Sequence, residues 1–469
     1  MTYARPETPL NGPNRATGPD RATGLPRNSV IDHPVAQTLF YAILFTIPYF
    51  RFRDLPGPFF MKVDYLLTAA LLAIVIPAVM VNKAVPARLR ANLWRPLGLF
   101  MLINVAATVL SPYPEQALGG LILLVAVVIF FAINLAMIND RGIDTYLLYV
   151  LGISCGLNAF LACLGYFLGV DYFVHESGRG IGGTIGANNM ALMSVFAIPL
   201  MVYWAVFGET ALRRMLGGGI TLLLLAALVA TESRGGFLNL LAVLGLLLLQ
   251  FRHHFHPRYL GLVVGGAAAA MAAVVTLVPK DYIERQASLG LILEWVTGDT
   301  REIAQDYALD RRTAYLAVAV DAFPKRPILG SGPDTFPKIW IESMETRWFD
   351  MEERPAHNTY IEVAIGTGAA GLLAFLGLLA MTYNNYRRAE HTLRAAGDER
   401  GAHLIGAYKI AFLAVLIYFF FKSGIDHKYF ILALPVSVAA LRYAGNRIAD
   451  APSTAMPRER TGGQTSGAS

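Results

Sequence analysis

The chain has 469 residues, of which 55% are hydrophobic and only 15% are charged, and its formal net charge is +6. This composition excludes a disordered chain and argues against a soluble globular protein, in which about a quarter of the residues are charged. Many of its apolar runs are about 17–25 residues long, which is the length that a helix needs to cross a bilayer. The composition therefore predicts an all-α polytopic membrane protein.

The apolar runs, taken in chain order, predict about twelve transmembrane helices. The predicted spans are 34–50, 64–81, 95–111, 116–138, 145–169, 190–207, 214–231, 235–251, 258–278, 357–382, 404–422 and 428–444. The predicted divisions of the chain are a disordered tail at 1–33, nine spans within 34–278, a hydrophilic segment at 279–356, three spans within 357–444 and a second disordered tail at 445–469.

The basic residues are distributed unevenly between the two sides of the predicted membrane. Most arginines, such as Arg387 and Arg388, fall in segments on the same side as the two tails. The short loops on the other side hold few basic residues, among them Arg179, Arg234 and Lys422. The positive-inside rule then places both tails in the cytoplasm and segment 279–356 outside. The positive charge reflects topology, so we predict no nucleic-acid partner.

The loop at 170–189 is rich in glycine, with Arg179 among the glycines and Asn189 at its end. Backbone N–H groups in such a loop can approach a phosphate closely. Glycine content alone is weak evidence, because loops also use glycine for ordinary turns. The placement of the arginine and the asparagine around the glycines is more specific, and makes both residues candidates for substrate binding.

Arg234 lies in a short polar stretch, residues 231–236, between two long apolar runs. A tight hairpin of two spans would hold it at a fixed depth, and Gly235 and Gly236 leave its guanidinium uncovered. A guanidinium held in this way is a good bidentate ligand for an anion. The alternative is an interfacial arginine that only extends its head group to water.

The hydrophilic segment 279–356 carries more acidic than basic residues and contains two amphipathic stretches, around Tyr315 and from Phe336. The helical spacing of the apolar residues predicts a small folded cap over the membrane. Arg311 and Arg312 are expected in the first turn of its first helix, where the helix dipole favours acids. The pair is either ordinary and solvated or placed there to bind an anion.

His357, Asn358 and Glu362 stand where the predicted cap returns to the membrane. Asn358 suits a helix N-cap, with Glu362 in the first turns. A histidine can accept a proton near neutral pH, which makes His357 a candidate for acid–base chemistry. The alternative readings are an interfacial histidine hydrogen-bonded to backbone and an ordinary helix acid.

Other classes of membrane or cofactor-dependent protein find little support. The spans contain few charged residues and no paired broken helices, which argues against a secondary transporter. The sequence has no Walker or dinucleotide-binding glycine motif. No carboxylate or His/Cys cluster has the spacing of a metal site, so we predict neither a metal nor a cofactor.

Four blocks carry a resemblance to a known family. They are Gly183-Thr184-x-Gly186-x-x-Asn189, Ser233-Arg234-Gly235-Gly236, Arg312 with Pro327-x-Leu329-Gly330-x-Gly332, and His357-Asn358-x-Tyr360-x-Glu362 with Gly368-x-x-Gly371. Together and in this order they resemble the O-antigen ligase and bacterial polysaccharide polymerase superfamily of membrane proteins. The resemblance covers roughly residues 35–445, including the large loop before the last spans.

The resemblance implies a metal-independent, inverting glycosyltransferase at the periplasmic face of the bacterial inner membrane. The implied donor is a glycan on undecaprenyl diphosphate, and the implied acceptor is a sugar hydroxyl on a glycan or lipid core. By the same resemblance Arg234 and Arg312 would hold the diphosphate, and His357 would assist the acceptor hydroxyl. Arg311 leaves the identity of the second arginine open. Two fixed guanidiniums could stabilise the anionic leaving group where no metal is bound.

The motifs do not separate a ligase from a polymerase, and the sequence gives neither the sugar, the linkage nor the oligomeric state. An alternative from another class is a non-catalytic membrane transporter or sensor of lipid-linked glycans. That alternative predicts that the donor is not consumed and that Arg234 and His357 tolerate substitution.

Overall fold

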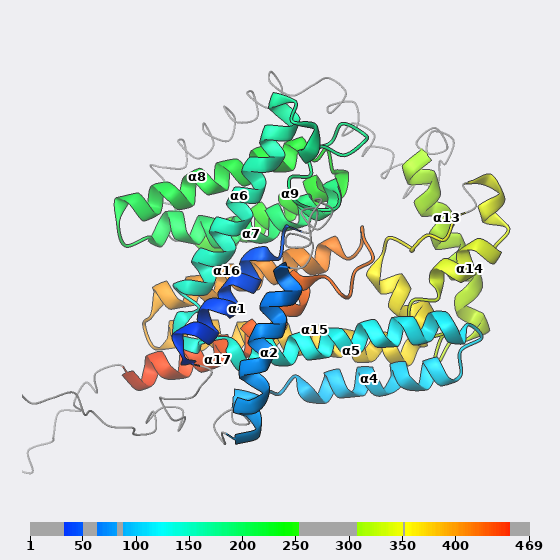
Figure 1. The fold of residues 1–469 in the computed structure, drawn as a ribbon, viewed down its shortest axis with the longest axis horizontal. Helices are drawn as coiled ribbons and strands as arrows, with labels where there is room; N and C mark the ends of the chain where they lie inside the picture. Colours follow the sequence, from blue (N-terminus) through cyan, green and yellow to red (C-terminus); the bar gives the residue numbers. More distant parts are fainter. Residues whose placement is uncertain (1–31, 50–62, 82–87, 253–306, 350–351, 451–469) are drawn as a thin grey trace, which may run out of the picture.

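The computed structural model describes residues 32–49, 63–81, 88–252, 307–349 and 352–450. In these ranges the regular secondary structure is helical and contains no strand. Long helices pack side by side, with a small helical cap at one end (Figure 1). The predicted span 258–278, the first part of the predicted cap and most of both predicted tails lie outside the described residues.

The main described helices are α1 (Pro34–Thr46), α2 (Val63–Val81), α4 (Trp94–Val109), α5 (Pro114–Met137), α6 (Tyr146–Leu168), α7 (Ala187–Phe207), α8 (Ala211–Ala230), α9 (Arg234–Phe251), α13 (Tyr307–Ala322), α14 (Phe336–Glu342), α15 (Thr359–Ala395), α16 (Glu399–Tyr418) and α17 (Lys428–Asp450). Short 3₁₀ turns, among them Glu345–Trp348, join some of them. Among the described residues seven helices are long and apolar enough to cross a membrane, namely α5, α6, α7, α8, α9, α15 and α16. The all-helical membrane fold is confirmed, whereas the number of twelve spans remains a prediction.

Helices α7 and α16 form the centre of the bundle. Both are buried along most of their length and pack against each other, and α8, α9 and α15 pack around them. A helix that is apolar on all sides is expected in such a position. Glycine permits the close approach of α7 and α8, because a Cβ atom at Gly217 would lie 2.6 Å from the Ala205 nitrogen. Small residues at helix contacts are typical of membrane bundles.

Helix α15 is broken at Gly368, whose φ of +63° lies in the left-handed region. The break leaves backbone groups without helical partners, which is costly inside a membrane. The cap segment Pro327–Gly332 supplies replacements on the carbonyl side. The Ser331 nitrogen donates to the Ile365 carbonyl at 2.9 Å, and the next nitrogen along the cap donates to the next carbonyl of α15 at 2.8 Å.

The same cap segment also accepts hydrogen bonds from α15 beyond the break. The Ala369 nitrogen donates to the Pro327 carbonyl at 2.8 Å, and the Ala370 nitrogen donates to the Ile328 carbonyl at 3.2 Å. The fit leaves no room for a side chain, since a Cβ atom at Gly330 would lie 2.5 Å from α15 backbone atoms. The glycines therefore allow the backbones of residues 327–332 and α15 to pair directly. We call this set of four backbone hydrogen bonds the splice between the cap and α15.

The described part of the cap has its own small core. The rings of Tyr315 on α13 and Trp340 on α14 are both buried and meet edge to face with centroids 4.6 Å apart. Helix α13 begins at Tyr307, so Arg311 and Arg312 lie beyond its first turn and Asp310 is the acid in that turn. The expected first-turn placement of the two arginines was wrong, and the helix-dipole argument does not apply to them.

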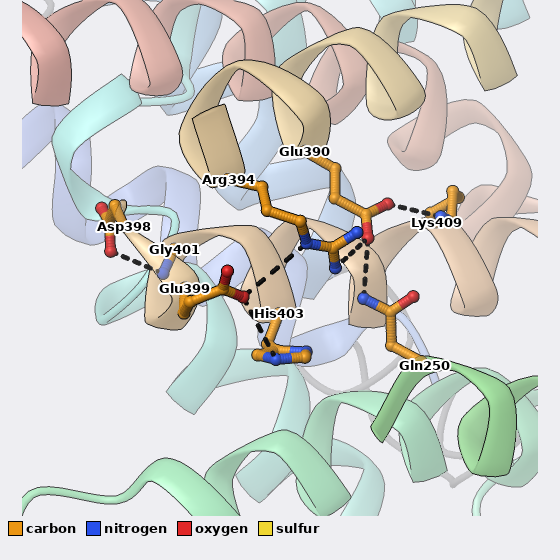
Figure 2. A network of polar contacts seen from close by, with 8 residues as sticks. All are labelled: Gln250, Glu390, Arg394, Asp398, Glu399, Gly401, His403 and Lys409. Carbon is orange, nitrogen blue, oxygen red and sulfur yellow. Dashed lines mark hydrogen bonds and ion pairs between the residues drawn. The ribbon is translucent and has the colours of Figure 1, made fainter. Parts of the chain in front are cut away.

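A polar network ties α9, α15 and α16 together far from the cap (Figure 2). The buried Glu390 carboxylate accepts hydrogen bonds from Gln250 at 2.8 Å and Arg394 at 3.0 Å, and it forms an ion pair with Lys409. A buried carboxylate needs such partners, because an unpaired charge is expensive to bury. The network holds the C-terminal end of α15, whereas the cap contacts its N-terminal half.

The two ends of α15 offer a direct test of membrane orientation. The helix has 37 residues, and at about 1.5 Å per residue it exceeds the thickness of the hydrocarbon core. We expect a reporter that needs the periplasm to be active when fused near Glu345 in the cap and inactive near Ala395 at the far end of α15. The opposite pattern would reverse the topology and remove every site assignment that depends on it.

Candidate functional site

The segment 419–427, which joins α16 to α17, is the place where the sequence blocks meet. The Thr359 hydroxyl at the start of α15 donates to the Lys422 carbonyl at 2.8 Å. The Ser423 hydroxyl donates to the Glu362 carboxylate at 2.7 Å. These bonds attach the block that begins at His357 to segment 419–427.

His357 itself has a constrained backbone. Its φ of +51° lies in the left-handed region, which costs a residue other than glycine about 1–3 kcal/mol and is common at functional sites. Hydrogen bonds on both sides hold this conformation. The Ala356 nitrogen donates to the Glu362 carboxylate at 2.6 Å, and the Asn358 amide oxygen caps α15 by accepting from two backbone N–H groups at 3.0 and 3.1 Å. Asn358 and Glu362 thus position His357 through these bonds.

The His357 side chain is partly buried in a positively charged environment. Its ring lies 5.8 Å from that of Tyr315, between centroids. Four positively charged side chains act on its imidazole, in decreasing order Arg312, Lys422, Arg311 and Arg354. Burial first, and these charges second, lower the pKa of His357 to about 4. His357 is therefore unprotonated at neutral pH, as a base must be.

Arg234 is the first residue of α9, whose start contacts segment 419–427. Ser233 caps α9, and its hydroxyl donates to the Asn188 side-chain oxygen at 2.9 Å. A Cβ atom at Gly235 would lie 2.9 Å from the Phe421 ring, so the start of α9 packs directly on the segment. Arg234 is thus held at a helix N-terminus, where the helix dipole also favours an anion.

The glycine-rich loop places Arg179 next to Asn188, which Ser233 also contacts. The Arg179 Nε donates to the Thr231 carbonyl at 2.7 Å, and its terminal nitrogen reaches the Asn188 side chain at 3.4 Å. The Gly180 nitrogen donates to a carbonyl of α8 at 2.7 Å, and the Gly183 nitrogen donates to a side chain of α6 at 2.6 Å. Because these N–H groups are already used, the glycines pack the loop and do not form a phosphate cradle.

The sequence did not single out Lys422 as a site residue. Its ammonium group donates to the Asn189 side-chain oxygen. The Tyr418 hydroxyl, one turn earlier, donates to the Asn188 carbonyl at the start of α7. Asn189 is therefore held by a lysine of the protein. The only available sequence signal was that Lys422 is a basic residue in a short outer loop.

A cavity of about 280 Å³ lies beside the start of α15. Its wall includes Thr359, Glu362 and Ser423, together with the carboxylates of Asp334 and Asp426. Burial, and then the neighbouring negative charge of Asp426, raises the pKa of Asp334 above its ordinary value. The cavity is thus acidic, whereas the side chains around His357 are basic.

Within the described ranges no group of three or more His, Cys, Asp and Glu side chains is arranged to hold a metal ion. Chemistry without a metal remains a prediction from the sequence, which a chelator can test.

Comparison with known proteins gives one family. A model described as O-Antigen ligase matches residues 219–376, a stretch that contains Arg234, Arg312, His357 and the break in α15. A search of curated proteins found no match to this chain. This match confirms the resemblance found in the sequence blocks: over residues 219–376 the chain is similar to the O-antigen ligase family.

Proposed function

We propose that the protein is a membrane glycosyltransferase that transfers or polymerises a glycan from undecaprenyl diphosphate onto a sugar hydroxyl at the periplasmic face of the bacterial inner membrane. The observation that carries the proposal is the position of His357, which Glu362 and Asn358 hold at the start of α15 and on which four cationic side chains act. An anionic leaving group and an acceptor that must lose a proton need this combination.

In the proposed reaction the acceptor oxygen attacks the anomeric carbon while the bond from that carbon to the phosphate oxygen breaks. Undecaprenyl diphosphate leaves with the bonding electrons, and the hydroxyl proton passes to the His357 imidazole. A single displacement inverts the anomeric configuration. Arg234 and Arg312 stabilise the negative charge on the leaving diphosphate, the role for which bidentate guanidinium groups are suited.

Donor binding also improves His357 as a base. Burial and, after it, the neighbouring cations lower the pKa of His357 in the free protein. A diphosphate bound among them adds negative charge, which favours the protonated imidazole and raises its pKa. The histidine thereby gains basicity when the donor is in place, which links proton transfer to donor binding.

The acidic cavity beside Thr359 supports a place for the acceptor. Carboxylate and hydroxyl oxygens accept hydrogen bonds from sugar hydroxyls, and Asp334, Asp426 and Ser423 supply such oxygens. A ligase would take its acceptor from a lipid core and a polymerase from a second lipid-linked glycan. Either acceptor presents the same kind of hydroxyl.

Transfer by the purified protein in excess EDTA tests both the reaction and its independence from metals. We expect full transfer from a lipid-diphosphate glycan, because two arginines provide the charge that a divalent ion would otherwise supply. Activity that vanished and returned only with magnesium or manganese would refute the arginine mechanism. A donor that is bound but never consumed, with any acceptor, would favour the transporter or sensor reading.

A further inference from the structure

A second, larger cavity also borders segment 419–427 and shares Ser423, Gly424 and Asp426 with the cavity beside α15. It has a volume of about 650 Å³ and lies between α1, α2, α5, α7 and the start of α17. Most of its wall is apolar and includes Ile47, Phe130 and Met193. The polar groups on its wall include Asn189, Lys422, Asp426 and Lys428. We call this cavity the lipid hollow. An apolar space whose polar groups include two lysines and one carboxylate suits a molecule in which an anion is attached directly to a hydrocarbon chain.

Lys422 is one of the two lysines on the wall of the lipid hollow. Its backbone is fixed by the bond from Thr359, and its ammonium donates to the Asn189 side chain, which occupies one of three N–H donors. The Asp426 carboxylate, which also lines the hollow, acts electrostatically on Lys422. In the described part of the chain Lys422 has no ion pair to offset its burial, which favours a bound anion.

Lys422 also acts electrostatically on His357. The same side chain therefore lines the lipid hollow and lies within electrostatic reach of His357. A lipid diphosphate has two phosphates in line, one carrying the glycan and one carrying the lipid. A donor with its diphosphate at Lys422 would have its lipid chain in the hollow and its glycan on the side of His357.

We propose that Lys422 binds the lipid-side phosphate of the donor and that the lipid hollow holds the first part of its isoprenoid chain. The inference rests on the proposed function for the identity of the donor. Arg234 and Arg312 then serve the sugar-side phosphate, whose bond breaks, and Lys422 anchors the part of the donor that leaves.

The first experiment measures binding of farnesyl phosphate to the purified full chain in detergent. Lys422→Met should weaken binding by about 10–100-fold, the usual effect of losing one charged hydrogen bond, and Lys422→Arg should restore most of it. Lys325→Met is the matched control, because Lys325 is an exposed lysine already paired with Asp321 at 2.6 Å. Wild-type affinity in Lys422→Met would overturn the proposal.

The second experiment tests the hollow without touching Lys422. Ala126 is exposed on α5 and borders the hollow, so Ala126→Trp fills the hollow without crowding the core. It should weaken binding of farnesyl phosphate and leave inorganic pyrophosphate unaffected. Val125→Trp, at an exposed neighbour outside the hollow, should change neither. Equal weakening of both ligands by Ala126→Trp would overturn the assignment, and this arm stands even if Lys422→Met fails to fold.

The third measurement separates the possible sources of the phosphate and the two levels of the hypothesis. Phosphatidylglycerol should bind weakly and independently of Lys422, and an equal dependence on Lys422 would make the hollow a general lipid site and refute the donor assignment. If farnesyl phosphate binding depends on Lys422 but no glycan is transferred, the proposed function fails while the lipid site stands. If transfer occurs and Lys422→Met binds normally, the lipid site alone is wrong.

Discussion

Replacement of His357 by alanine is expected to slow glycan transfer by about 10²–10³-fold while donor binding changes little. The side chain is proposed to take the acceptor proton, and the neighbouring guanidiniums hold the donor without it. Removing the imidazole also leaves the backbone anchors of the segment, Glu362 and Asn358, in place. Donor binding and single-turnover transfer should be measured separately on the same detergent preparation.

His175→Ala provides the matched control, because His175 is an exposed histidine in the glycine-rich loop and its ring interacts with Ser177. It should transfer at the wild-type rate. Comparable thermal unfolding of both variants would show that insertion and folding are intact. Wild-type transfer by His357→Ala would make the histidine an interfacial anchor and remove the base from the mechanism.

The pH dependence of the wild-type protein gives a finer test of the same role. Because the pKa of His357 is about 4 in the free protein, the acid limb of kcat/KM should lie near pH 4. The bound diphosphate raises that pKa, so the acid limb of kcat should lie at higher pH. Both limbs should be missing from the residual activity of His357→Ala. Coincident limbs in the wild-type protein would show that the donor does not bind within reach of His357.

Arg234→Lys is the second change with a large expected effect. Lysine keeps the charge but cannot form two parallel hydrogen bonds to a phosphate. Losing one charge-assisted bond should weaken donor binding by about 10–100-fold, and turnover should fall as well because the same group stabilises the leaving diphosphate. Isothermal titration with a lipid-diphosphate glycan, followed by a transfer assay at saturating donor, separates the two effects.

The same substitution decides between the two arginines of α13. Arg312 has a larger effect on His357 than Arg311 has, so Arg312→Lys should resemble Arg234→Lys and Arg311→Lys should be milder. Arg347→Lys, at an exposed cap residue, should be silent. If Arg234→Lys binds and turns over the donor as the wild type does, Arg234 does no more than anchor α9 at the interface.

Hydropathy located the membrane helices well but not their ends. The predicted span 357–382 stops where the apolar run stops, whereas α15 continues to Ala395. The extension is polar and carries Glu390, which is buried by partners on other helices. A hydropathy window detects an apolar stretch long enough to cross the bilayer. It therefore cannot detect the part of a helix that continues beyond that stretch as a polar sequence.

The break in α15 at Gly368 could not be predicted from sequence patterns. Gly366, Gly368 and Gly371 lie in an apolar run and read equally well as small residues at a helix contact. The left-handed φ of Gly368 is stable only because the cap segment Pro327–Gly332 supplies the missing hydrogen bonds. That pairing links residues far apart in the chain, and no local preference encodes it.

The candidate site was predictable in its chemistry and not in its assembly. From the sequence, the arginines were predicted to bind an anion and His357 was predicted to accept a proton. The segment that joins these residues, 419–427, contains no recognisable motif, and its lysine becomes notable only once Asn189 and Thr359 are seen to contact it. The role of the glycine-rich loop was likewise ambiguous until its N–H groups were found to be occupied.

The splice between the cap and α15 constrains both biosynthesis and recombination. The cap segment precedes α15 in the chain, and the hydrogen-bond ladder of α15 is completed only when residues 327–332 have folded back onto that helix. A cap grafted from a relative would leave Ile365 and Ala369 without backbone partners unless both sides of the splice were exchanged together. In a chimaera, residues 327–332 and residues 365–371 should therefore be exchanged together, and not the loop alone.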